Sequence, residues 1–237
     1  MPRVFITGDK HGNFKFLKTW CKKAGTTKDD YLIVLGDCGI NYWLTKRDKK
    51  LKHQISRCPI TLICIHGNHE ARPATISNYI KEFNYDIQCG VWYEKQFPNI
   101  LFPDDGEMII NNQTYLILGG AYSVDKFHRL ENGGKWFEDE QMSQRSKDRI
   151  LRFIETENSF DYILSHCAPL KYEPIHLFLS FIEQKNVDKT MEKFLDIVLD
   201  KVDFKFWFLG HYHSDEWLNP KTRLFYHDIV EIVETDN

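Results

Sequence analysis

The chain has 237 residues, of which 42% are apolar and 14% aromatic, enough to form the core of a globular protein. Its net charge of -3 argues against a wide binding surface for nucleic acid or anionic membranes, although local basic patches stay open. No apolar run reaches the ~18 to 20 residues that span a bilayer, and the first residues lack the apolar core of a signal peptide. We therefore expect a cytoplasmic protein that does not insert into membranes.

The first third of the chain alternates apolar runs with helix-like segments. Residues 4–8 and 31–36 are predicted to be strands, and the amphipathic residues 14–25 between them to be a helix. A second helix over 41–56 leads to a third continuous apolar strand over 60–67. Apolar strands separated by helices are typical of a parallel sheet covered on both faces, so we expect these three strands to be parallel.

The pattern changes in the middle of the chain. A helix is predicted near 74–84, followed by short antiparallel strands with Asn111 and Asn112 at a hairpin tip. The later elements are a charged helix over 138–157, a strand over 161–166, a helix within 187–200 and strands over 204–210 and 224–233. We find no repeat or linker and expect residues 1–237 to form one α/β domain.

Polar side chains follow the carboxyl ends of five predicted strands. They are Asp9 and His11, Asp37, Asn68 and His69, His166, and His211 and His213, in chain order. Ligands bind at this edge of an open α/β sheet, so residues more than 200 positions apart can converge there. The oxygen and nitrogen atoms of Asp, Asn and His suit borderline and hard divalent cations. Without His69 there are seven candidate ligands, more than one four-coordinate ion can use. This number predicts two ions bridged by one carboxylate.

Five motifs contain these residues: GDKHG, LGDCG, HGNHE, LSHCAP and GHYH, in this order from residue 8 to 213. The chain thereby resembles the calcineurin-like metallophosphoesterases, whose pattern is D-x-H, G-D, G-N-H, an isolated H and G-H-x-H. The resemblance implies a mixed β-sheet sandwich flanked by helices, in four layers α/β/β/α. It also implies a dinuclear-metal hydrolase of phosphate esters, either a phosphatase or a phosphodiesterase.

The resemblance implies a role for each residue as well. Asp9, His11 and His213 would bind the first metal ion, Asn68, His166 and His211 the second, and Asp37 would bridge both. With Asn68, His69 would contact the substrate phosphate and donate a hydrogen bond or a proton, while a metal-bridging hydroxide attacks directly. Glu70 would orient one of the histidines. Manganese is the favoured metal, and iron, zinc, cobalt or nickel are the alternatives.

The segment 119–141 mixes aromatic residues with charged ones after a predicted strand. Long loops of this composition often carry function, so we expect it to line the metal cleft and select the substrate. Arg129 would grip the phosphate, and an aromatic side chain such as Tyr122 would contact a planar group. A loop that merely packs on the core agrees equally well with the sequence.

The expected substrate is a small phosphomonoester or phosphodiester, with nucleotides among the candidates. The second motif lacks the arginine of the G-D-x-V-D-R-G pattern of protein Ser/Thr phosphatases, which argues against a protein substrate. One alternative is a nuclease acting on single strands or ends, because Lys46, Arg47, Lys49, Lys50, Lys52 and Arg57 lie on one predicted helix. The other alternative is a metal-binding regulatory protein with little turnover. The sequence leaves the oligomeric state open.

Overall fold

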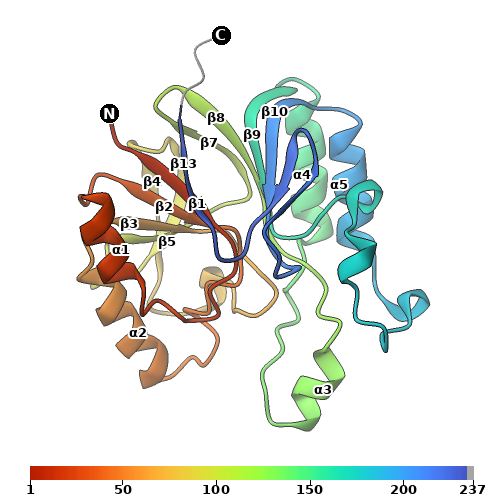
Figure 1. Cartoon of the computed structure of the whole chain (residues 1–237), viewed down its shortest axis with the longest axis horizontal. Helices are drawn as coiled ribbons and strands as arrows, with labels where there is room; N and C mark the ends of the chain where they lie inside the picture. Colours follow the sequence, from red (N-terminus) through yellow and green to blue (C-terminus); the bar gives the residue numbers. More distant parts are fainter. Residues whose placement is uncertain (234–237) are drawn as a thin grey trace.

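The computed structural model describes residues 1–233, in which the strands form two mixed sheets (Figure 1). The first sheet has the order β13 (Ile229–Ile232), β1 (Val4–Thr7), β2 (Tyr31–Val34), β3 (Thr61–Cys64), β6 (Ile100–Pro103), β5 (Cys89–Tyr93) and β4 (Ile80–Asn84). The second has the order β11 (Glu216–Asn219), β12 (Thr222–Leu224), β10 (Asp203–Leu209), β9 (Ser159–Ser165), β8 (Gln113–Leu118) and β7 (Gly106–Ile110).

Helices cover the outer faces of both sheets. The first sheet is covered by α1 (Leu17–Ala24) and α2 (Lys46–Ser56), and the second by α4 (Gln144–Ile154) and α5 (Thr190–Leu199), whereas α3 (Lys126–Glu131) lies on an arm that leaves the body (Figure 1). Separate apolar cores fill the space between the sheets and the space under each helix pair. This order of layers confirms the expected α/β/β/α architecture. None of the helices within residues 1–233 is long and apolar enough to cross a bilayer.

Parallel pairing brings the functional strand ends to one edge. Val4 lies opposite Tyr31 and Tyr31 opposite Thr61, which confirms that β1, β2 and β3 are parallel. In the second sheet, β9 runs parallel to both β8 and β10. The carboxyl ends of β1, β2, β3, β9 and β10 converge between the two sheets, on the side where α3 projects (Figure 1).

The helix predicted near 74–84 is wrong. A short 3-10 turn, η1 (Pro73–Thr75), is followed by β4, whose Ile80 pairs with Tyr93 of β5 in an antiparallel ladder. Ile and Phe side chains favour strands when a partner supplies the hydrogen bonds. The partner β5 was not predicted either, so the pairing that decides the conformation was missing from the sequence interpretation.

Two smaller differences concern strand and helix boundaries. The strand predicted over 224–233 is divided between β12 and β13, which belong to different sheets, and β11 was not expected. The helix predicted from residue 41 begins at Lys46, because the side chain of Thr45 accepts a hydrogen bond from Arg47 N and caps it. The hairpin tip is confirmed: Asn111 and Asn112 have φ of 54° and 61° between β7 and β8.

Candidate metal centre

All eight polar residues predicted from the motifs meet at the shared edge of the sheets. The ligand atoms of six of them form three overlapping groups, and within each group all atoms lie within 4.8 Å of one another. The groups are Asp9 with His11 and His213, His11 with Asp37 and His69, and Asp9 with Asp37 and His166. The remaining two residues join them directly. Asn68 Oδ1 lies 2.9 Å from His166 Nε2, and His211 N donates to Asp9 Oδ1 over 2.8 Å.

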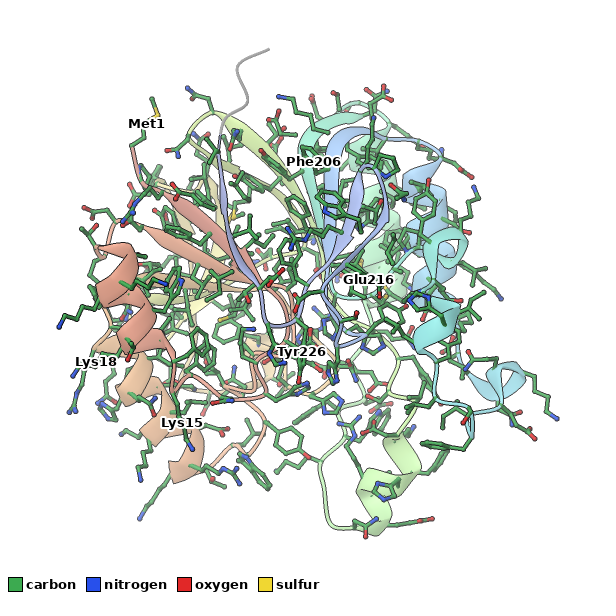
Figure 2. The ribbon with its side chains drawn as sticks, in the orientation of Figure 1. Met1, Lys15, Lys18, Phe206, Glu216 and Tyr226 are labelled. Carbon is green, nitrogen blue, oxygen red and sulfur yellow. The ribbon has the colours of Figure 1, made fainter. Side chains whose placement is uncertain are left out.

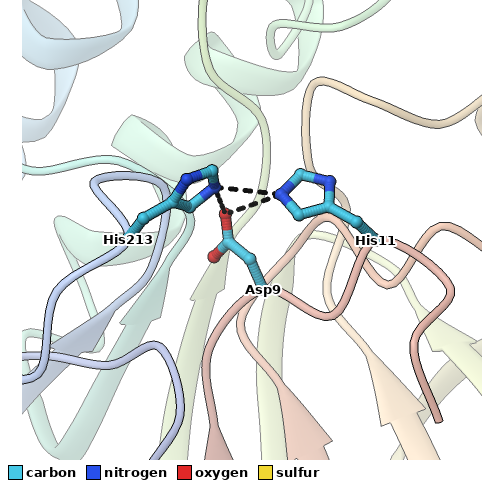
Figure 3. Close-up of side chains that lie close together, drawn as sticks. All are labelled: Asp9, His11 and His213. Carbon is cyan, nitrogen blue, oxygen red and sulfur yellow. Dashed lines mark hydrogen bonds and ion pairs between the residues drawn. The ribbon is translucent and has the colours of Figure 1, made fainter. Parts of the chain in front are cut away.

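The first group is open to solvent on its histidine side. His213 Nε2 and His11 Nε2 lie 3.2 and 3.8 Å from Asp9 Oδ2 and 2.9 Å from each other, so three ligand atoms face one point (Figure 3). Asp9 itself is buried, and its Oδ2 has no hydrogen-bond partner among the described residues. A buried carboxylate oxygen facing two imidazole nitrogens is an arrangement that suits a divalent cation.

Asp37 lies between this group and the buried histidines. Its Oδ2 is 3.9 Å from both His11 Nδ1 and His69 Nε2, and its Oδ1 is 3.5 Å from His166 Nε2 and accepts a hydrogen bond from His69 N over 2.7 Å. Burial opposes ionisation of Asp37, but the neighbouring His166 and His69 outweigh it and hold the pKa of the carboxyl well below its usual range. Asp37 is therefore a charged carboxylate in contact with both halves of the site.

His166 and Asn68 have fixed orientations in the interior. His166 is fully buried, and its Nδ1 donates to the carbonyl of Leu35 over 2.7 Å, which leaves Nε2 facing the site. Asn68 Nδ2 donates to Ser123 Oγ over 2.8 Å, so Oδ1 is the atom turned toward His166. Burial alone would lower the pKa of His166, but the negative charges of Asp37 and Asp9 outweigh burial and raise this pKa to about 9. An added cation beside the two carboxylates would replace the proton of this imidazolium.

The backbone around the site adopts conformations that ordinary residues avoid. His11, Asp37, His211 and His213 all have positive φ, between 44° and 72°. Non-glycine residues in this region cost about 1 kcal/mol or more, and such strain collects at functional sites. Glycine is required at position 67, because a Cβ there would lie 2.1 Å from the Asp37 backbone nitrogen. Close approach of the two loops thus brings Asp37 and Asn68 together.

Two buried carboxyl groups support the site in ways that the sequence did not reveal. Glu70 was expected to orient a histidine, but it accepts hydrogen bonds from Gly67 N, Gly39 N and Cys38 Sγ, so it ties together the loops after β2 and β3. Glu140 binds both the backbone nitrogen and the hydroxyl of Ser123, the residue that orients Asn68. No local motif marks Glu140, which lies 72 positions after Asn68.

The segment 119–141 leads to the site but presents its residues unequally. Tyr122 and Asp125 line the cavity beside the metal-site residues. Arg129, expected to grip phosphate, is only 8% exposed, and its Nε lies 3.0 Å from Asp125 Oδ1. Asp125 Oδ1 lies in turn 4.0 Å from His69 Nε2. Arg129 therefore faces the site through Asp125.

Sequence interpretation missed the opposite wall of this cavity. Residues 177–189 supply Leu177, Phe178, Ile182, Val187 and Lys189 to it. The apolar run IHLFLSFI over 175–182 was the available signal, but it has neither strand alternation nor a helix-length pattern. Within the run lies the short turn η3 (Ile175–Leu177), and η4 (Gln184–Asn186) follows it.

Comparison with known proteins agrees with this geometry. Among curated proteins, none matches the chain in sequence. One solved structure aligns with 95% of this chain and with 90% of the chain in that structure, at 13% sequence identity and a TM-score of 0.50. This likeness concerns the fold alone. The family model described as calcineurin-like phosphoesterase matches residues 2–215, nearly the whole chain. The chain therefore belongs to the calcineurin-like phosphoesterases, a family of dinuclear-metal-dependent enzymes that hydrolyse phosphate esters.

Proposed function

We propose that this protein hydrolyses small phosphate monoesters or diesters, nucleotides among them, at two divalent metal ions bound by the strand-end residues. The observation that carries this proposal is the convergence of Asp9, Asp37 and their neighbouring histidines, in which the buried Asp9 Oδ2 accepts no hydrogen bond from the described residues and faces the imidazoles of His11 and His213. When bound, the two ions supply Lewis acidity toward the phosphoryl oxygens and a nucleophilic water at neutral pH. Manganese is the first candidate for both positions.

The residues divide between two ion positions. Asp9, His11 and His213 would hold the first ion, and Asn68, His166 and His211 the second, with Asp37 between the two positions. Support for this division comes from the first group, whose three ligand atoms face one another, and from the contact of Asn68 with His166. The Leu35 carbonyl fixes the ring of His166, so Nε2 keeps its direction when the proton is exchanged for a cation.

His69 acts on the substrate. Its side chain is 25% exposed and borders the cavity, and its Nε2 is within 4.0 Å of both Asp37 and Asp125. It donates a hydrogen bond to a nonbridging phosphate oxygen or a proton to the leaving oxygen. Asp125 positions this ring, and Arg129 holds Asp125. Asn68 and Tyr122 line the same cavity, and we propose that both contact the substrate.

The test is metal-dependent hydrolysis of p-nitrophenyl phosphate and bis-p-nitrophenyl phosphate by the full chain. Activity should disappear when metal is removed, return with manganese and stay absent in Asp37→Asn, which keeps the side-chain shape. The faster substrate identifies the enzyme as a monoesterase or a diesterase. Turnover that is independent of metal, or an Asp37→Asn variant that works normally, would contradict the proposal. Metal binding without any turnover would favour the regulatory alternative.

A second candidate, a nuclease acting on single strands or ends, is favoured by uneven charge. Residues 14–57 hold 11 of the 31 Lys and Arg but only 4 of the 34 Asp and Glu, which leaves a net charge of -10 on the rest of the chain. Lys18 on α1 and Lys15, two residues before this helix, are exposed and labelled in Figure 2, and Lys49 and Lys50 are exposed on α2. Lys52 is different, because it is buried and paired with Glu94.

Charge reversal separates the two candidates. If nucleic acid is the substrate, Lys49→Glu with Lys50→Glu should slow cleavage of a single-stranded oligonucleotide and flatten its dependence on salt, while p-nitrophenyl phosphate hydrolysis is unchanged. Lys193→Glu with Lys201→Glu, exposed at and beyond α5, is the matched control. If the two double variants have equal effects, or if the protein cleaves no oligonucleotide at all, the nuclease function is contradicted.

A further inference from the structure

A cavity of about 260 Å³ opens directly beside the metal centre. One end is polar and consists of Asp37, Asn68, His69, His211 and His213. Its volume is near the lower limit of small-molecule sites, the scale of one ring system. A ligand in this cavity therefore meets the metal-site residues with one end and a different surface with the other.

The rest of the cavity is mainly apolar. It is lined by Val124, Leu177, Phe178, Leu179, Ile182, Val187 and Tyr212. Apart from Lys189, which is paired with Glu173, this part of the cavity offers no cation to a phosphate group, and anions are bound by cations and hydrogen-bond donors. The wall instead fits the organic part of an ester, which gains binding free energy when its apolar surface leaves water.

The wall is anchored to the second sheet and yet is not core. Phe178 stacks on Tyr212 with ring centroids 6.3 Å apart, and Lys189 Nζ lies 4.8 Å from the Phe178 ring while pairing with Glu173 at 2.5 Å. Ile182 and Val187 are half-buried and belong to none of the three apolar cores of the described chain. These two side chains therefore remain accessible to a ligand in a positioned segment.

A buried carboxyl group borders the apolar part. Glu192 on α5 is 3% exposed, and its Oε2 has no hydrogen-bond partner among residues 1–233. An unpartnered buried oxygen costs free energy that a hydrogen bond from a ligand would offset. Glu192 thus adds a buried acceptor to the apolar wall, besides the more exposed Asp125 and Gln184, and such polar groups fix the orientation of a ring in small-molecule sites.

We propose that this cavity binds the organic part of the phosphate ester, and that this part is an uncharged ring carrying a hydrogen-bond donor that meets Glu192. This inference rests on the proposed function, because it takes the metal centre as the phosphate site. Hydroxyphenyl groups and nucleobases both belong to this class of group. Leu177, Ile182 and Val187 are then the residues that determine specificity.

Calorimetric binding of phosphonates, which are not hydrolysed, tests the apolar wall on the manganese-loaded full chain. Phenylphosphonate should bind at least about tenfold more tightly than methylphosphonate, because one ring buries much more apolar area than a methyl group. Ile182→Ser and Val187→Ser should bring this ratio toward one. The adjacent Phe181 is 78% exposed and does not line the cavity, so Phe181→Ser is the matched control and should keep the ratio.

The donor is tested separately. 4-Hydroxyphenylphosphonate should bind more tightly than phenylphosphonate, and Glu192→Leu should abolish that difference while retaining a side chain of similar size. Adenosine monophosphate and 4-hydroxyphenyl phosphate, compared by kcat/KM, distinguish a nucleobase from a hydroxyphenyl group. Equal binding of phenyl- and methylphosphonate by a protein that hydrolyses phosphate esters would overturn this inference alone. Binding of neither phosphonate would overturn the proposed function together with the inference.

Discussion

The buried carboxyl of Glu192 makes the stability of this protein depend on pH. Burial, reinforced by Glu173 and Asp188 and only partly opposed by Lys189, raises its pKa from 4.5 to about 7. Because the folded-state pKa is raised, the protonated form contributes stability that is fully present below pH 4.5 and is lost as the pH rises through 7. At pH 8.5 the folded protein must keep an ionised carboxylate in this place.

Glu192→Gln removes the titrating group while keeping the shape of the side chain. A shift from 4.5 to about 7 corresponds to about 3 kcal/mol between the two ends of the pH range. For a chain of 237 residues this difference amounts to about 6 to 12 °C in Tm. We expect the Tm of the variant minus the Tm of the wild type to rise by this amount when the pH is raised from 4.5 to 8.5.

The assay is thermal unfolding followed by circular dichroism at both pH values, with metal removed from all samples. Other groups titrate in this range, so the quantity compared is the difference in Tm between variant and wild type at each pH. Glu157→Gln, at an exposed position after α4, is the control and should give the same small difference at both. A Glu192→Gln difference that does not change with pH would refute the reasoning.

Three further outcomes follow from the site. Gly67→Ala should lower Tm by several degrees and weaken metal binding, because the added Cβ would lie 2.1 Å from the Asp37 backbone nitrogen. Gly25→Ala is the control: its φ is +62°, but no atom lies within 4 Å of the added Cβ, so the free energy of unfolding should fall by only about 1 kcal/mol. Equal losses of stability in the two variants would contradict this reasoning. Asp125→Asn should reduce kcat for p-nitrophenyl phosphate by about tenfold or more without loss of metal, and an unchanged kcat would remove Asp125 from the account. Removal of metal by a chelator should lower Tm by about 5 to 10 °C relative to protein in a free metal concentration of 100 times the Kd. Thermal unfolding with and without the chelator measures this difference.

Where local signals decide the conformation, the sequence predicts this structure well. The strands β1, β2 and β3 are continuous apolar runs, and each is followed by a residue of the motifs, so both the parallel sheet and the edge at which Asp9 and Asp37 meet could be predicted. The Asn111–Asn112 tip was also predictable, because asparagine tolerates positive φ in a two-residue turn.

Prediction was weaker where partners outside the segment itself decide the conformation. β4 is a strand because β5 pairs with it, and the two strands were both missed. The sequence did not indicate that Asp125 and the Lys135 carbonyl would hold Arg129, whose contact with phosphate stays a prediction. The apolar wall at 177–189 lacks periodicity, since it borders a cavity and belongs to no sheet or long helix.

The central claim is that strand-end residues spanning the chain hold two divalent ions through Asp37. Its most direct test is the metal content of the purified full chain, measured by mass spectrometry after equilibration with manganese and removal of free ion. The wild type should retain about two ions per chain and Asp37→Asn fewer than one, because that carboxylate contacts both halves of the site. A wild type that retains no metal, or an Asp37→Asn variant that retains the same amount, would contradict the account.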